Sequence, residues 1–484
     1  MHRKQREGIL TPRSKETLMR VPQLSWSRLL ATSLLSVAPF TSALQAQLSP
    51  TQVPDEPWRL NRWLNPPDNF KFSGSERIRY EGLNGQYRAN GTGALPNGTR
   101  EDEDQLFSRL LLRADYTRGK WGATLEGIDA RAWGTKANSF ANTTTVSTFD
   151  LLQANVSYEM AQGHRVTVGR YTMDIGSRRL SARNRFRNTI NSFNGARWDY
   201  QGENGYSAGA FWAMPTTRLP ATRALLVDNE DEGDTQSLDY QFYGLHSTQM
   251  LDEDTSAQFY ALQLSDHRTS ARSRDLTTVG ARVFTPAAPG QIFGEAEVAY
   301  QFGTREATAG TSVTQDVHAY FAHASIGKQW NHSMKPTVRV ALDVASGDDT
   351  NDGTSFGRFD TMFGARRFEY GPTGIYGTIG RRNIVSPEIR ISFNPSENTW
   401  IMVGARDFRL AQQSDGWREA GDASGTSADI GQQVECRLRW DVMPKSVRLE
   451  GGAAYLSGGQ FRDTSTAGRP SDTRYFFFQA IFTF

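Results

Sequence analysis

The sequence predicts an all-β fold, a transmembrane antiparallel up-and-down β-barrel of about 18 strands. Three observations predict it. The chain is polar on average, with a mean hydropathy of −0.56, although aromatic residues make up 11% of it. Segments of about ten residues alternate apolar with polar side chains, as strands do when one face meets lipid and the other meets water. An aromatic segment of this kind ends the chain at Phe484.

The first 46 residues have the order of a secretory signal peptide. Residues 1–28 are basic, a short apolar run follows at 29–40, and small residues lead to a cleavage site after Ala46. The run of about 12 apolar residues is too short for a membrane-spanning helix. We therefore expect residues 1–46 to be removed on export, with Met19 as an alternative start because the segment is long for such a peptide.

The remaining chain divides into a lead-in and a barrel. Residues 47–69 are rich in proline and predict a periplasmic lead-in, and residues 70–484 predict the barrel. An even strand number lets both ends of the barrel face the periplasm. Eighteen strands leave room for water unless loops fold inward. The expected strands lie near 70–80, 105–116, 121–130, 149–159, 164–171, 195–201, 206–213, 238–246, 256–265, 275–284, 291–303, 316–328, 336–345, 384–393, 399–409, 431–441, 446–456 and 475–484.

The segment 433–440 shows the alternation most clearly. Its apolar face carries Val434, Cys436, Leu438 and Trp440, and its polar face carries Glu435, Arg437 and Arg439. A soluble β-sandwich also alternates, but here the polar faces repeatedly carry arginine and glutamate, while the apolar faces end in tryptophan or tyrosine. Aromatic residues at strand ends are typical of the girdles at membrane interfaces.

The last segment, 475–484, predicts the strand that closes the barrel. One of its faces is formed by Phe476, Phe478, Ala480, Phe482 and Phe484. An alternating aromatic strand that ends in phenylalanine resembles the closing strand of bacterial outer-membrane barrels. The resemblance implies that the barrel-assembly machinery reads Phe484 and that outer-membrane lipid and lipopolysaccharide surround the barrel.

Residues 168–198 resemble the alginate export family of outer-membrane barrels. The family shows Gly-Arg-Gln at a strand end, then Gly-x-x-Arg-Leu, then a Phe-Asp-Gly turn. Tyr171 and Asn194 depart from it, standing where Gln and Asp are usual. The matching residues are Gly169, Arg170, Gly176, Arg179, Leu180, Phe193 and Gly195.

A second match begins at residues 346–348, Ser-Gly-Asp, and continues through a long loop. The loop holds Thr361, Phe363, Gly371 and then Asn383, without the Pro and His that the family has near that Phe. The resemblance covers residues 70–484. It implies a monomeric eighteen-stranded channel that secretes an acidic polysaccharide through a pore lined by arginines and partly occluded by loops.

Arginine supplies most of the positive charge. Eight of the 54 basic residues are lysine, so 46 are arginine, while the net charge of +2 gives no sign of a nucleic-acid binder. A GC-rich genome is one reading of this excess. The functional reading is a pore, since planar arginine forks match carboxylates and rings of them select anions. Lumenal arginines can also simply pair with neighbouring glutamates. The expected lining residues are Arg77, Arg79, Arg109, Arg113, Arg170, Arg179, Arg183, Arg339, Arg437 and Arg439, and the 172–194 loop adds Arg178, Arg185 and Arg187.

Other functions have weaker support in the sequence. We expect no catalytic residue and no cofactor, because the histidines lie in no recognised motif and the single Cys436 excludes a cysteine zinc site. Acidic runs at 101–104, 228–234 and 348–352 could hold Ca²⁺ but read more simply as solvated outer loops. An uptake porin for small anions or acidic oligosaccharides shares the fold and the arginines. Periplasmic secretion proteins are candidate partners.

Overall fold

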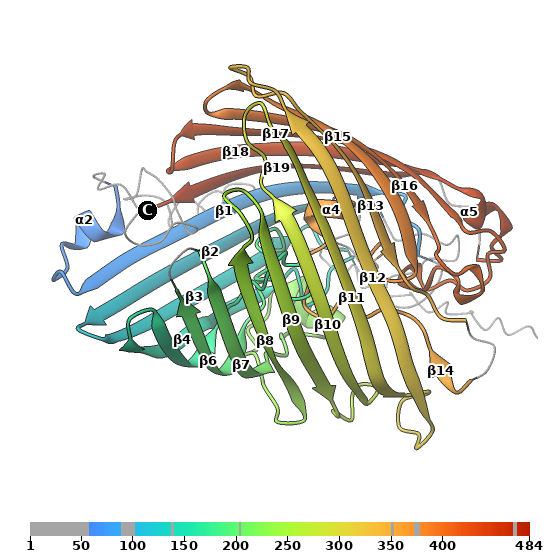
Figure 1. Ribbon diagram of the computed structural model, residues 1–484, viewed down its shortest axis with the longest axis horizontal. Coiled ribbons are helices and arrows are strands. Elements are labelled where there is room, and N and C mark those ends of the chain that lie inside the picture. The colour runs from blue at the N-terminus through green and yellow to red at the C-terminus, as the bar shows by residue number, and fades with distance from the viewer. Residues whose placement is uncertain are drawn as a thin grey trace, which may run out of the picture. The chain divides into compact units, whose positions relative to one another are not determined.

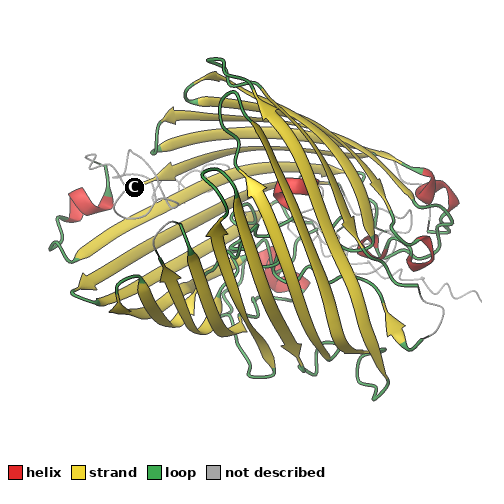
Figure 2. Cartoon of the chain, in the orientation of Figure 1, coloured by secondary structure: helices red, strands yellow, loops and turns green. Residues whose placement is uncertain are grey.

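A ring of long strands forms the body of the protein (Figures 1 and 2). The computed structural model describes residues 58–88, 102–136, 140–202, 205–349, 353–371, 378–467 and 472–484. The strands are β1 (Phe70–Asn84), β2 (Glu103–Arg118), β3 (Trp121–Trp133), β4 (Ser147–Ala161), β5 (His164–Tyr171), β6 (Phe193–Gln201), β7 (Ser207–Pro215), β8 (Tyr240–Met250), β9 (Ser256–Asp266), β10 (Arg274–Thr285), β11 (Ile292–Glu306), β12 (Thr314–Gln329), β13 (Thr337–Ala345), β14 (Ser355–Phe356), β15 (Ile384–Ser396), β16 (Thr399–Arg409), β17 (Asp429–Met443), β18 (Val447–Gly458) and β19 (Thr473–Thr483).

The sheet closes on itself. Every neighbouring pair in the ring is antiparallel, and β1 pairs with β19 over residues 75–84 and 474–483. The short β14 pairs in parallel with β12, outside the order of the ring, so 18 of the 19 strands form the barrel. Each of the eighteen segments expected from the sequence overlaps one ring strand, and the predicted fold class is confirmed.

The alternation places apolar side chains on the outside. In β17, Val434 and Trp440 are 54% and 47% exposed, while Glu435 is buried in the interior. Cys436 is exposed on the same outer face as Val434, as expected of a lipid-facing residue. No helix among the described residues is long and apolar enough to cross a membrane. The helical turns are α2 (Leu60–Leu64), α3 (Arg223–Asp228), α4 (Arg367–Tyr370), α5 (Gln460–Thr464), η3 (Gln413–Asp415) and η4 (Arg418–Ala420).

The two rims of the barrel differ in their connections. Tight turns such as residues 119–120 and 444–446 lie at one rim, and long connections such as 172–192 and 346–383 leave from the other. Short turns are periplasmic and long loops extracellular in outer-membrane barrels, so the rim with the 444–446 turn is the periplasmic one.

Part of the lead-in is anchored at the periplasmic rim. Arg59, just before α2, donates hydrogen bonds to the carbonyl oxygens of Thr483 and Lys445, both at 3.0 Å, and to Ser446 Oγ at 2.8 Å. These bonds tie the chain ahead of β1 to the end of the closing strand. The predicted signal peptide, residues 1–46, and the lead-in up to residue 57 lie outside the described residues, so the predicted domain boundaries stay predictions.

Two long loops fold into the barrel and meet there. We call them the β5–β6 loop (residues 172–192) and the β13–β15 loop (described at residues 346–349, 353–371 and 378–383, and including α4). Phe363 accepts a hydrogen bond from the Ala182 amide (3.2 Å) and donates one to the Leu180 carbonyl (3.0 Å). α4 accordingly lies inside the ring in Figure 1. The sequence itself predicted long loops here. That the loops partly occlude the pore was implied only by the family resemblance.

An aromatic cluster fixes the β13–β15 loop to the far wall. The ring of Phe363 lies 5.2 Å from that of Phe193 on β6 and 4.9 Å from that of Phe242 on β8. Both wall residues are fully buried. Burial of these rings removes apolar surface from water and favours the docked position of the loop.

Candidate functional site: the channel lumen

Arg179 of the β5–β6 loop is held by carboxylates from two other parts of the molecule. Its side chain is 2% exposed. It pairs with Glu295 and Glu297 of β11, the latter at 2.6 Å, and with Glu369 of α4. Arg381 of the β13–β15 loop also pairs with Glu369 and donates to the Arg179 carbonyl at 2.9 Å. We call these five residues the latch, because they join both inner loops to the wall.

The latch is balanced in charge. Its three glutamates face Arg179 and Arg381, and Arg282 of β10 pairs with Glu295 at 2.7 Å. Three guanidinium groups therefore meet three carboxylates. A buried ion-pair network of this kind is costly to break at one member, because the remaining charges stay buried without partners.

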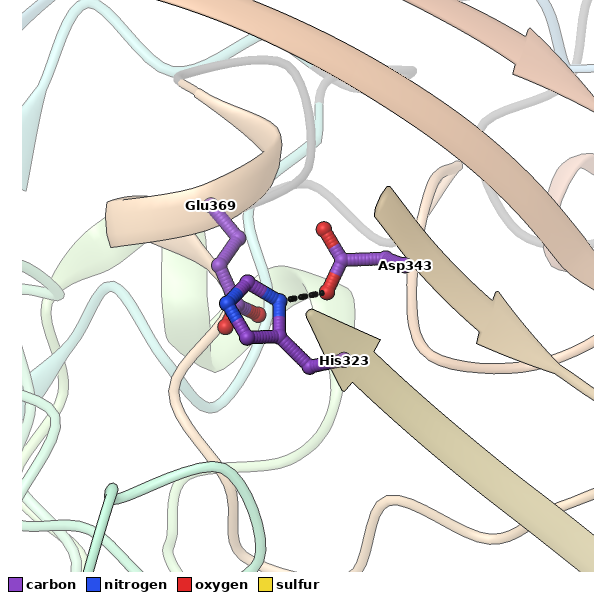
Figure 3. A group of neighbouring side chains, drawn as sticks. All are labelled: His323, Asp343 and Glu369. Carbon is purple, nitrogen blue, oxygen red and sulfur yellow. Dashed lines mark hydrogen bonds and ion pairs between the residues drawn. The ribbon is translucent and has the colours of Figure 1, made fainter. Parts of the chain in front are cut away.

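A second buried group lies beside the latch. Figure 3 shows His323 of β12, Asp343 of β13 and Glu369 of α4, with His323 Nδ1 2.7 Å from Asp343 Oδ1. Among the described residues this is the group of three potential metal ligands, whose donor atoms lie within 4.8 Å of one another. Arginines already occupy the carboxylates, since Arg406 lies 2.8 Å from Asp343 and Glu369 binds two arginines. These positive charges disfavour a cation there.

The acidic runs predicted as possible Ca²⁺ sites contribute no residue to the group of His323, Asp343 and Glu369. In the described parts of the acidic runs at 101–104, 228–234 and 348–352, no cluster of three potential ligands forms. Ca²⁺ in the outer loops thus stays a prediction. The expected absence of a cofactor stays a prediction as well. The same holds for the expected absence of enzymatic activity.

Three arginines of β1 and β2 hold the tip of the β5–β6 loop through its backbone. Arg77 donates to the carbonyls of residues 185, 186 and 187 at 3.0–3.1 Å and to Asn188 Oδ1 at 2.9 Å. Arg109 donates to the carbonyls of residues 185 and 187, both at 2.9 Å. Arg79 donates to the Phe186 carbonyl at 2.5 Å. Three arginines of the wall therefore fix the loop tip through its main-chain carbonyls.

Below this tip lies a cavity of about 670 Å³ on the periplasmic side of the inner loops. The 444–446 turn and the end of β19 line its lower part. Eleven cationic residues line it against three carboxylates, Asp174, Asp441 and Glu450. The cations are Arg77, Arg109, Arg178, Arg185, Arg187, Arg366, Arg367, Arg437, Arg439, Lys445 and Arg448.

The positive charge stays in excess when carboxylates that pair with the lining arginines from outside the cavity are also counted. Arg366 pairs with Glu419 at 3.5 Å and Arg367 with Glu435 at 3.7 Å, and neither glutamate lines the cavity. Eleven cations minus five carboxylates still leaves six. Burial, and after it the charge of nearby Arg437, lower the pKa of Arg367 to about 10. Crowded guanidinium groups of this kind favour the arrival of an anion.

The sequence matches the alginate export family, described as "Alginate export", over residues 79–474. The chain belongs to this family. No curated protein shows significant sequence similarity to it. The barrel is similar to OpdL of Pseudomonas aeruginosa, with a TM-score of 0.54, 14% identity, and 86% of this chain and 99% of that chain covered. It is also similar to OpdO of P. aeruginosa (0.56, 13%, 86% and 97%) and to a BenF-like porin of Pseudomonas fluorescens Pf-5 (0.56, 11%, 86% and 99%).

These structural neighbours share the fold alone, because their sequence identities are low. Together with the family they make this chain a channel of the bacterial outer membrane. Both the predicted resemblance and the predicted localisation are confirmed.

The ten arginines expected to line the pore separate into two groups in this alginate export barrel. Four of them line the cavity: Arg77, Arg109, Arg437 and Arg439. The other six lie outside its lining and each pairs with a carboxylate: Arg79, Arg113, Arg170, Arg179, Arg183 and Arg339. Contact with a substrate stays a prediction for all ten.

Sequence reasoning missed part of the cavity. Arg366 and Arg367 were outside the expected set, although they form an adjacent pair in a long loop. Lys445 was read only as part of a tight turn. The alternation pattern assigns faces to strand residues and says nothing about which loop side chains point into the lumen.

Proposed function

We propose that this outer-membrane channel exports an anionic polysaccharide, an alginate-like polyuronate, through a lumen lined by arginine. The observation that carries the proposal is the excess of six positive charges around the periplasmic cavity. A neutral solute would gain nothing from such an excess. A polymer with one carboxylate per sugar matches it along its whole length.

The chemistry of the cavity suits a passing polymer. Guanidinium groups bind carboxylates through paired N–H donors. Many such groups with similar strength let a chain exchange one partner for the next, and conduction requires binding that is favourable but weak at each site. The position of the cavity at the periplasmic rim supports entry from the periplasm, and therefore export.

The test is a measurement of ion selectivity and block in a planar bilayer with the purified, refolded protein. We expect anion selectivity, and block by oligouronates that tightens as the oligomer lengthens, since longer chains meet more arginines. Neutral oligosaccharides of the same lengths are the matched control and should not block. Cation selectivity, or equal block by neutral and acidic oligomers, would contradict the proposal.

Uptake of small carboxylates is the second candidate. It is favoured by the similarity to the barrel of P. aeruginosa OpdK, whose structure contains vanillate (TM-score 0.53, 11% identity). The same bilayer experiment separates the two candidates. If a monomeric carboxylate blocks as tightly as a long oligouronate, the uptake function is supported and the polymer function is not.

Two partners belong to the same proposal. The barrel-assembly machinery would read Phe484, the last residue of the aromatic outer face on which Phe476 and Phe478 of β19 are exposed. Periplasmic secretion proteins would deliver the polymer to the rim that holds the 444–446 turn.

A further inference from the structure

A second basic pocket lies on the extracellular side of the inner loops. It has a volume of about 390 Å³ and shares no lining residue with the periplasmic cavity. Its charged lining residues come from the extracellular ends of β10 and β11 and from the loops around β14 and η4. They are Arg272, Arg305, Arg358, Arg418 and Asp348.

Two of these arginines have no carboxylate partner among the described residues. Arg358 forms a two-pronged pair with the buried Asp415, with its Nε at 2.7 Å, and Arg418 lies 3.6 Å from the same carboxylate. Arg305 donates only to the carbonyl of Glu306, at 3.1 Å. Neither Arg272 nor Arg305 forms an ion pair with any described residue. The pocket therefore presents unmatched positive charge.

An aromatic ring holds the guanidinium groups in place. Arg305 lies over Phe356 with its guanidinium carbon 3.7 Å from the ring centre, and that of Arg358 lies 5.1 Å from the same centre. A guanidinium that contacts a ring through its face keeps its N–H edges available for an acceptor in its own plane. A carboxylate is an acceptor of that geometry.

The pocket opens to the lumen and not to lipid. Arg305 lies on the same face of β11 as Glu297 and Gln301, which are buried in the interior, while Val298 and Tyr300 on the other face are exposed. A lipid headgroup outside the barrel does not have access to this face. The ligand that reaches it comes through the channel or from the extracellular mouth.

We propose that this pocket is a second carboxylate site, which binds uronate groups of the polymer after they pass the latch. The inference rests on the proposed function, since it takes the same substrate. A polyanion in the strongly basic periplasmic cavity needs a second favourable site beyond the latch, because conduction stalls when the only binding site lies on the entry side.

The test is calorimetric titration of the detergent-solubilised channel with a trimeric oligouronate. We expect two trimers bound to each wild-type chain. The pair Arg272→Gln with Arg305→Gln should remove one of them, with the dissociation constant of that site raised about ten-fold or more, because each lost charge-assisted hydrogen bond weakens binding. Arg272 is exposed, so Arg272→Gln alone keeps the fold and should weaken the same site by a smaller factor.

Two further variants separate this site from the periplasmic one. Arg187→Gln with Arg439→Gln should remove the other trimer and leave the extracellular one. Arg409→Gln, an arginine that is 61% exposed and pairs with Asp407, is the matched control and should keep both. If the wild type binds one trimer that only the Arg187 and Arg439 pair removes, the second site is refuted and the proposed function stands. If the only trimer bound is lost with Arg272 and Arg305, the periplasmic cavity, and with it the proposed function, is refuted.

Discussion

The latch and the periplasmic cavity are both built from arginine, but they treat its charge in opposite ways. In the latch and the neighbouring Arg282, three guanidinium groups face three carboxylates, two of them fully buried. Around the cavity, eleven cations face five carboxylates. The first arrangement holds two loops against the wall, and the second leaves charge that a ligand can neutralise.

The comparison shows how a structural arginine differs from one that can bind a ligand. The difference lies in the number of carboxylates available to pair with the arginines, and not in the number of arginines. A matched pair gains little from an incoming anion, because the anion must displace a carboxylate that is already in place. An unmatched arginine gains a partner at once. The arginine-rich sequence alone does not make this distinction.

The largest expected effect comes from breaking the latch. Arg179→Gln leaves Glu295, Glu297 and Glu369 with too few positive partners, and loss of one member of a buried ion-pair network costs about 3–5 kcal/mol. We expect the two inner loops to undock and the single-channel conductance to rise several-fold. Hydrogen exchange at the amides of Ala182 and Phe363, which donate hydrogen bonds between the two loops, should rise with it.

Arg282→Gln is the control for this variant. This variant also removes one positive partner of Glu295. However, Arg282 and Glu295 both belong to the wall, on β10 and β11, so no loop contact is lost. Its conductance should stay close to that of the wild type. An Arg179→Gln channel with unchanged conductance and unchanged exchange would show that the latch does not hold the loops.

A smaller effect is expected when the cavity loses two of its six excess positive charges. Arg187→Gln with Arg439→Gln removes two cations without touching the latch. We expect a lower anion-to-cation permeability ratio and block by oligouronates weakened by about ten-fold, the change that 1.4 kcal/mol produces. Reversal potentials in a salt gradient measure the first quantity, and titrated block measures the second.

Arg197→Gln tests whether position matters. Arg197 pairs with Asp199 on β6 and does not line the cavity. It changes the net charge in the same direction, so selectivity and block should move much less than in the cavity variant. Equal effects of the two changes would mean that total charge, and not the unmatched charge of the cavity, sets the selectivity.

The sequence was sufficient for the ring of strands and insufficient for the interior. The alternation is local, so each strand of the barrel could be read from about ten neighbouring residues. The latch joins Arg179 to Glu297, which is 118 residues away. A contact between such distant residues leaves no local pattern, and the inner position of the loops was implied only by the family resemblance.

The arginine cradle of the loop tip shows the same limit in another form. The alternation correctly placed Arg77 and Arg109 on the inner face of their strands. Their partners are backbone carbonyls of residues 185–187, which any sequence provides. The pattern could therefore predict the direction of these side chains but not that they hold a loop.

The smallest expected effect concerns two neighbouring carboxylates, Asp234 and Asp150. Asp234, in the loop between β7 and β8, lies beside Asp150, whose Oδ2 accepts a hydrogen bond from the Asp234 amide at 2.9 Å. Burial and then the charge of Asp150 raise the pKa of Asp234 to about 7. The proton is therefore bound more tightly in the docked loop than in an open one, so docking weakens as the pH rises from about 4 to about 7 and is constant above that.

Hydrogen exchange at Thr217 and Thr235 measures this docking, because their amides bond to each other's carbonyls at 2.8 and 3.0 Å. After correction for the intrinsic rate, we expect protection of both amides to fall between about pH 4 and about pH 7 and to stay constant above that. Asp234→Asn cannot ionise and should keep the protection constant over this range. The amides of Ala182 and Phe363, which join the two inner loops, should show no such trend in either protein. A pH response that persists in Asp234→Asn would place the titrating group elsewhere and would restrict the charge-matching argument to the arginines.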